Sequence, residues 1–175
     1  MIILIAGGTH TGKTLLAQKL LEKHGYPYLS IDHLKMALIK TGLCRLAPES
    51  DEQELTACLW PIVREMAVTV LENRQNLIIE GCYIPFDYQR WFSDEQLRHL
   101  RYICLIFSES YIEKYYDDIM RQANVIEIRK HDDELISRED LIRENTRNLN
   151  RCLEYGLDHL LIDGSYEVSW DIFGQ

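Results

Sequence analysis

Short apolar runs alternate along this chain with longer stretches in which apolar residues recur every three or four positions. Continuous apolar runs are typical of strands that are buried on both faces, whereas the wider spacing is typical of amphipathic helices. The apolar runs lie at residues 2–6, 26–31, 76–80, 102–107 and 159–163. Strands that alternate with helices in this way predict an α/β fold, a three-layer sandwich with a five-stranded parallel sheet.

The first helical stretches carry recognisable start and stop signals. The pattern predicts a helix over 13–24 that ends at Gly25, a residue type that readily adopts the left-handed conformation at a helix end. Asp32 is placed to cap a second helix over 33–41, and Gly42 follows as its stop.

Capping residues predict where the later helices begin. Ser50 and Gln53 have capping-box spacing ahead of a long amphipathic stretch. Pro61 should kink or split this helix, unless it falls at the first turn of a second piece. Three further helices are predicted from capping signals at Ser93, Ser110 and Ser137.

Composition indicates one folded unit. The chain has 175 residues, of which 46% are hydrophobic and 27% charged, and no Pro/Gly/Ser-rich linker divides it, so we expect a single domain over 1–175. No apolar stretch is long enough to span a membrane, and the first residues lack the features of a signal peptide, which favours a cytoplasmic protein. Five cysteines without C-x-x-C spacing predict reduced thiols. A net charge of −9 argues against broad nucleic-acid binding.

The most specific motif is GGTHTGKT at residues 7–14, which matches G-x-x-x-x-G-K-[ST] between a predicted strand and a predicted helix. Glycines at such positions let backbone amides surround phosphate oxygens, and the helix start adds its positive dipole end. Lys13 would bridge the terminal phosphates and Thr14 would reach Mg²⁺. We therefore expect the nucleotide to be bound by Gly7, Gly8, Thr9, His10, Thr11, Gly12, Lys13 and Thr14.

His10 is an unusual residue for the middle of such a loop. It could hydrogen-bond within the loop, or it could face the acceptor and add a charge that titrates near pH 6.5. The structural role is favoured because backbone amides do the binding in these loops.

In layout the chain resembles the small P-loop kinases, a superfamily that includes adenylate, shikimate and gluconate kinases, chloramphenicol phosphotransferase and zeta toxins. The resemblance rests on the phosphate loop, on a second strand that ends near Asp32, and on a third strand that ends at Glu80 and Gly81. It implies the sheet order 2-3-1-4-5, ATP as the phosphoryl donor and Mg²⁺ as the cofactor.

The same resemblance assigns roles to two carboxylates. Asp32 would contact the acceptor hydroxyl and serve as its base, and Glu80 would hold Mg²⁺ through water. In adenylate-kinase-like proteins an arginine that grips a nucleotide monophosphate follows closely, but here the nearest arginine is Arg90. That departure favours an acceptor other than a nucleotide. Aromatic residues after Glu80 could line an apolar acceptor pocket or pack as an ordinary loop: Tyr83, Phe86, Tyr88 and Trp91.

A charged segment around 121–137 resembles the lid of these kinases, here a short one. Arg121 and Arg129 flank its irregular part and would stabilise charge on the transferred phosphoryl group, although arginines on a helix surface would look the same. Gly164, in the turn after the fifth strand, would allow backbone contact with adenine, although a simple turn at the end of a strand would look the same.

These features predict a kinase that transfers the γ-phosphoryl group of ATP to a small-molecule acceptor. A nucleoside or nucleotide kinase is one alternative, and a P-loop NTPase that acts as a regulatory switch is another. A toxin-like kinase of nucleotide sugars is a further alternative. The sequence leaves the acceptor open.

Overall fold

The computed structural model describes residues 1–122 and 136–168, and its centre is a five-stranded sheet. The strands are β1 (Ile2–Gly7), β2 (Tyr28–Ser30), β3 (Leu77–Glu80), β4 (Leu100–Phe107) and β5 (His159–Ile162). Their order is β2-β3-β1-β4-β5, and all four pairings are parallel. The predicted α/β fold and its strand order are therefore confirmed.

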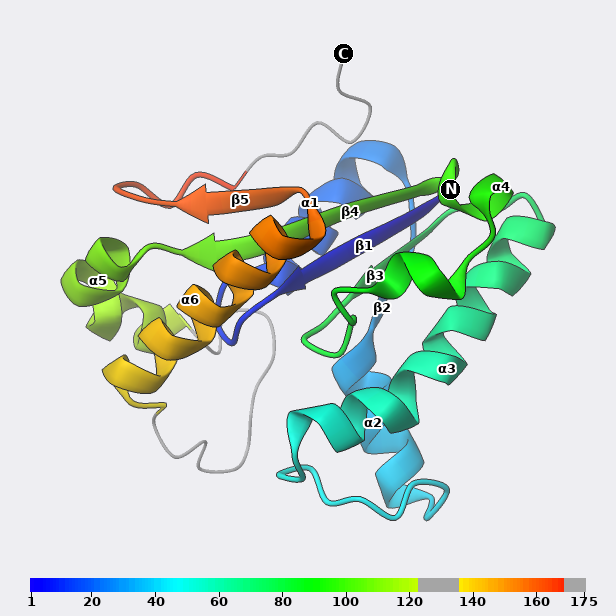
Figure 1. Cartoon of the computed structure of the whole chain (residues 1–175), viewed down its shortest axis with the longest axis horizontal. Coiled ribbons are helices and arrows are strands. Elements are labelled where there is room, and N and C mark those ends of the chain that lie inside the picture. The colour runs from blue at the N-terminus through cyan, green and yellow to red at the C-terminus, as the bar shows by residue number, and fades with distance from the viewer. Residues whose placement is uncertain (123–135, 169–175) are drawn as a thin grey trace.

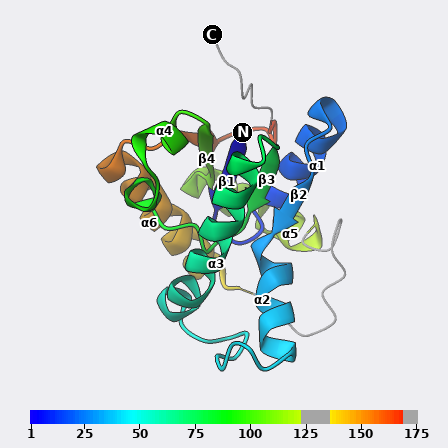
Figure 2. The ribbon, with the colours of Figure 1, turned by 90° about the vertical axis from the view of Figure 1, so that its right-hand side faces the viewer.

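Helices cover both faces of the sheet. They are α1 (Lys13–His24), α2 (Ile31–Lys40), α3 (Glu52–Glu72), α4 (Asp94–Leu97), α5 (Glu109–Gln122) and α6 (Arg138–Tyr155), with a 3₁₀ turn at Tyr88–Trp91. Figure 1 shows α3 and α6 in front of the sheet, and Figure 2 shows α6 and α1 on its opposite sides. No helix within the described ranges is long and apolar enough to cross a membrane.

Successive side chains of β1 pack alternately in two separate cores, one on each face of the sheet. Ile2 and Leu4 pack in the cluster that includes residues of α3, whereas Ile3 and Ile5 pack with residues of α1. All four side chains are fully buried, which explains why β1 is apolar without alternation.

The parallel arrangement brings three segments that the sequence predicts to be functional to the carboxyl edge of the sheet. The loop of residues 7–14 follows β1, and Asp32 follows β2 by two residues. Glu80 ends β3 and is paired in register with Ile5 of β1 and Ser30 of β2. The edge of an open parallel sheet beyond the carboxyl ends of its strands is the usual ligand-binding region of this architecture.

Two predicted helix caps are wrong by one or two residues. The helix after β2 begins at Ile31 with Ser30 as its N-cap, so Asp32 lies in the first turn and does not cap the helix. At α3 the cap is Asp51, whose carboxylate accepts from the amides of Gln53 and Glu54, because Ser50 is turned back to accept from the Ala47 amide.

Ser110 is also not a cap, because α5 already begins at Glu109. The hydroxyl of Ser108 instead accepts a hydrogen bond from the Tyr111 amide at 3.0 Å. The caps predicted at Ser93 and Ser137 are confirmed, and Ser93 also forms a capping box with Gln96.

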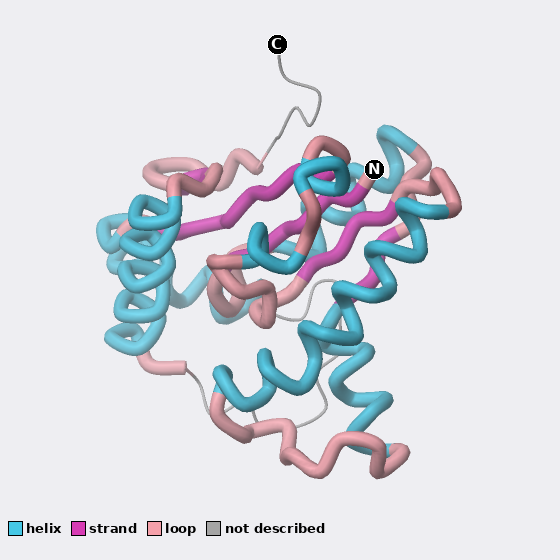
Figure 3. The backbone as a smooth tube through the Cα atoms, turned by 45° about the vertical axis from the view of Figure 1, so that its right-hand side comes forward, coloured by secondary structure: helices cyan, strands magenta, loops and turns pink. Residues whose placement is uncertain are grey.

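Pro61 neither breaks nor divides α3, which is one helix. The neighbouring side chains Trp60 and Val63 are both buried in the same core. Their packing outweighs the backbone hydrogen bond that proline cannot donate. Figure 3 shows that α2 and the first turns of α3 extend away from the strands.

Candidate functional site

The loop of residues 7–14 has a conformation that only glycine can supply at its first position. Gly7 has φ 145°, and a Cβ there would lie 2.5 Å from the carbonyl oxygen of Leu105 and 2.8 Å from the Thr11 hydroxyl. Gly12, with φ 87°, turns the chain into α1 in the left-handed conformation. Both glycines of the sequence motif are thus required by the backbone.

The start of α1 is suited to an anion. Within the described part of the chain no side chain caps this helix, so its first amides lack the partners that a cap would provide. These amides carry the positive end of the helix dipole and lie at the carboxyl edge of the sheet.

Inside the loop, the Gly8 carbonyl accepts hydrogen bonds from two side chains. It accepts from the Thr11 hydroxyl at 2.8 Å and from the Lys13 ammonium at 2.7 Å. Thr11 is fully buried and Lys13 is only 8% exposed. The loop therefore holds Lys13 over its own backbone, where it would meet phosphate oxygens.

Negative groups surround the Lys13 ammonium. Burial by itself would lower the pKa of Lys13. Negative neighbours nevertheless raise this pKa well above its ordinary value; they are the Cys82 thiolate and the carboxylates of Glu80, Glu144 and Asp32. Burial raises the pKa of Cys82 to about 11, so at neutral pH this group is an uncharged thiol and the carboxylates keep Lys13 charged. The predicted residues Asp32 and Glu80 thus lie within electrostatic reach of Lys13.

His10 adopts a left-handed backbone, with φ 62°. This conformation is rare for a residue with a Cβ and is the reason that glycine is common in such loops. His10 thus occupies a strained position of the loop backbone, and the role of its side chain stays a prediction.

On the side of α2, Asp32 is part of a short polar chain. The Lys35 ammonium lies 2.9 Å from the Asp32 carboxylate and donates to the Tyr83 hydroxyl at 2.9 Å. Burial alone would lower the pKa of Lys35, but the Asp32 charge raises it. Lys35 is therefore a fixed cation that orients Asp32.

Two groups could hold a divalent cation beside the phosphates. The Glu80 carboxylate is 2% exposed at the end of β3, and Thr14 follows Lys13 in the first turn of α1. Carboxylate and hydroxyl oxygens are ligands that Mg²⁺ accepts. Among the described residues no group of three or more His, Cys, Asp or Glu side chains could hold a metal ion, so phosphate oxygens and water would have to complete its shell.

The predicted lid residues are only partly described. Arg121 lies at the end of α5, exposed, with its guanidinium 2.8 Å from Asp118 one helical turn away, which fits a surface role. Arg129 and most of the predicted lid lie in 123–135, outside the described residues. Gly164 has φ 93° in the turn after β5.

The aromatic residues after β3 divide into different environments. Tyr83 reaches the site through Lys35, but Tyr88 stacks on Tyr102 in the core, with ring centroids 5.0 Å apart. Trp91 is 43% exposed and Phe86 packs against the core. Of the four, Tyr83 contacts a predicted site segment, through its hydrogen bond with Lys35.

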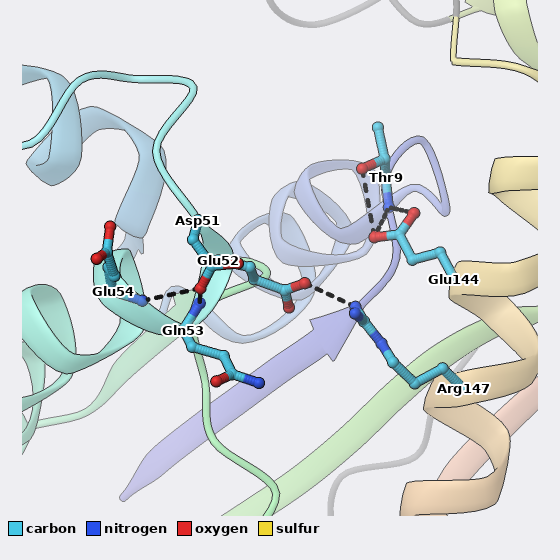
Figure 4. Close-up of polar contacts among 7 residues, drawn as sticks. All are labelled: Thr9, Asp51, Glu52, Gln53, Glu54, Glu144 and Arg147. Atoms are coloured by element: carbon cyan, nitrogen blue, oxygen red, sulfur yellow. Dashed lines mark hydrogen bonds and ion pairs between the residues drawn. The ribbon is translucent and has the colours of Figure 1, made fainter.

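Two contacts at the loop were not foreseen from the sequence. The Tyr166 hydroxyl donates to the carbonyl of Thr11 at 3.2 Å, and a Cβ on Gly12 would collide with that hydroxyl. From α6, Glu144 accepts from the backbone amide of Thr9, at 3.1 Å to each carboxylate oxygen. Figure 4 shows Glu144 pointing at the loop. Neither residue belongs to a local motif, so no sequence signal could have marked it.

Comparison with known proteins gives a likeness of fold. No protein-family model matches the chain, and no curated protein matches its sequence. An inferred kinase from Chloroflexus aurantiacus matches with a TM-score of 0.57 at 20% identity, over 98% of this chain and 89% of that one. A sugar kinase from Janibacter and a shikimate kinase from Bacteroides thetaiotaomicron each match with a TM-score of 0.52 at 16% identity, over 93% of this chain and 84% and 86% of theirs. The chain therefore has the fold found in these kinases.

Proposed function

We propose that this protein is a cytoplasmic, ATP- and Mg²⁺-dependent kinase that transfers the γ-phosphoryl group to a hydroxyl of a small molecule. The observation that carries the proposal is the convergence of Lys13, Asp32 and Glu80 at one edge of the sheet, around a loop built to bind phosphate. The kinases that share the fold support the same class of reaction.

In this proposal the residues have separate tasks. The loop amides and Lys13 hold the triphosphate and balance the charge that develops on the β–γ bridging oxygen as its bond to phosphorus breaks. Asp32 accepts the proton of the acceptor hydroxyl while the new oxygen–phosphorus bond forms. Lys35 and Tyr83 keep the Asp32 carboxylate in place.

The remaining roles follow from the same assignment. Thr14 and Glu80 would hold Mg²⁺, which neutralises phosphate charge when it is bound. Arg129, in the predicted lid, would stabilise the transferred group, and the turn at Gly164 would contact the base. Since no arginine lies between Glu80 and Arg90, we place the acceptor outside the nucleotides.

A phosphate-transfer panel tests the function. The purified protein is incubated with Mg²⁺, ATP and sugars, phosphoglycerates, nucleosides or antibiotics, and ADP release is followed together with product mass. We expect at least one acceptor to gain a phosphoryl group. Slow ATP hydrolysis that no acceptor accelerates would refute the kinase proposal and favour an NTPase switch.

Two variants separate donor binding from transfer. Lys13→Ala should abolish nucleotide binding or turnover, whereas Asp32→Asn should still bind ATP but transfer phosphate about 10²–10⁴-fold more slowly, the usual contribution of a general base. Asp94→Asn, the same change at an exposed site on α4, serves as the control. Normal transfer by the Asp32→Asn protein would remove Asp32 from the catalytic role.

A further inference from the structure

Glu144 places a carboxylate on the phosphate loop of the protein itself. Both of its oxygens lie 3.1 Å from the Thr9 backbone nitrogen, and one lies 3.4 Å from the Thr9 hydroxyl. A Cβ on Gly8 would stand 3.1–3.2 Å from the same carboxylate, so glycine permits this close approach. A loop amide that is oriented to receive an anion thus already faces one (Figure 4).

The Glu144 carboxylate places a negative charge near Lys13, as a bound phosphate would. Glu144 is among the groups whose negative charge raises the pKa of Lys13, the residue assigned to the terminal phosphates. Charged acceptors form the stronger hydrogen bonds with backbone amides. Glu144 and a bound phosphate would therefore use the same partners.

The helix that carries Glu144 contacts the sheet and α3 through residues that follow Glu144. The next residue, Asn145, is 1% exposed, and its side-chain oxygen accepts from the Phe107 amide at 2.8 Å. One turn further on, Arg147 pairs with Glu52 of α3 at 2.6 Å. Because these contacts fix α6, Glu144 can leave the loop by rotating its own side chain while the helix stays in place.

We propose that Glu144 is a built-in competitor of the nucleotide: its carboxylate occupies the Thr9 amide until a phosphate group displaces it. This inference rests on the proposed function, because it takes the loop to be the donor site. The exchange lowers the apparent affinity for the nucleotide, since part of the binding free energy is used to remove Glu144.

Calorimetric titration with Mg²⁺ and a non-hydrolysable ATP analogue tests the inference. Glu144→Gln removes the charge and should bind the analogue about tenfold more tightly than the unmodified protein, the effect of losing one charged hydrogen-bond competitor. Glu139→Gln makes the same change at an exposed position in the first turn of α6 and should bind as the unmodified protein does.

A second variant separates the contact from the charge. Glu144→Asp keeps the negative charge but shortens the arm, so it should also bind more tightly if occupation of the Thr9 amide is what competes. Binding equal to the unmodified protein would mean that only long-range charge matters and would overturn the inference, as would weaker or unchanged binding by Glu144→Gln. If neither the unmodified protein nor Glu144→Gln bound the analogue, the proposed function itself would fail.

Discussion

His10 is the residue whose type fits its backbone conformation least well. A left-handed φ of 62° costs a residue with a Cβ about 1–2 kcal/mol, and glycine avoids this cost. Glycine, however, loses more conformational entropy on folding than other residues, at a cost of about 0.5–1 kcal/mol. The balance between the two terms can be measured by substitution.

We expect His10→Gly to be more stable than His10→Ala by about 1 kcal/mol, because both variants lose the imidazole and only glycine relieves the backbone. Urea unfolding of the two variants measures the difference. Equal midpoints would contradict the prediction, because they would show that the backbone strain at this position does no more than offset the entropic cost of glycine. Little change in phosphate transfer by His10→Gly would support the structural role of this side chain.

Lys13 and Asp32 show how residue type and position combine. Lysine at the end of the glycine loop could be recognised from the motif, and the role of the carboxylate after the second strand was implied by the resemblance. The Lys35–Tyr83 contact that orients Asp32 joins residues 48 positions apart, so it depends on how β2 and β3 pair. The sequence thus shows the chemical type of a residue, but it does not show which distant residue is its partner.

At the scale of elements, α6 connects the parts of the site. It contacts the phosphate loop through Glu144, the end of β4 through Asn145 and the first turn of α3 through Arg147. Of these, the Asn145 contact is buried, and its amide nitrogen also donates to the Leu141 carbonyl at 2.8 Å. Asn145 therefore joins the helix to the sheet through a buried hydrogen bond.

Asn145→Ala should lower the free energy of unfolding by about 2 kcal/mol, because the Phe107 amide would stay buried without its acceptor. Chemical denaturation measures the loss. Asn150→Ala, an exposed site on the same helix, should change stability by less than about 0.5 kcal/mol. A similar small effect at Asn145 would contradict the anchoring role.

Helix boundaries show the limit of local signals. Ser50 and Asp51 are adjacent and both can cap a helix, and the choice between them depends on the turn in which Ser50 binds the Ala47 amide. Pro61 should interrupt a helix by its own chemistry, but burial of its neighbours keeps α3 continuous. Local preference is overruled where packing contributes more free energy.

At the scale of the whole molecule, the site joins distant segments, so a ligand bound there should stabilise the entire fold. With Mg²⁺ and ATP at about 100 times the dissociation constant, linkage adds about 2.7 kcal/mol to the free energy of unfolding. For a chain of 175 residues this corresponds to a rise in melting temperature of about 5–10 °C.

Thermal denaturation with and without Mg²⁺ and ATP checks this prediction, and Lys13→Ala should show no comparable rise. An equal rise in that variant would mean that the nucleotide binds elsewhere.

The sequence by itself determined the layers, the strand-and-helix alternation and the position of the phosphate loop, because hydrophobic periodicity and glycine requirements are local properties. The strand order came from the resemblance, and the sheet confirms it. Only the tertiary structure decided what meets the loop. Glu144 and Tyr166 contact it from 135 and 155 positions away, and a contact between distant residues leaves no periodic or spacing signal. It arises from the way α6 and the segment after β5 pack at the carboxyl edge of the sheet.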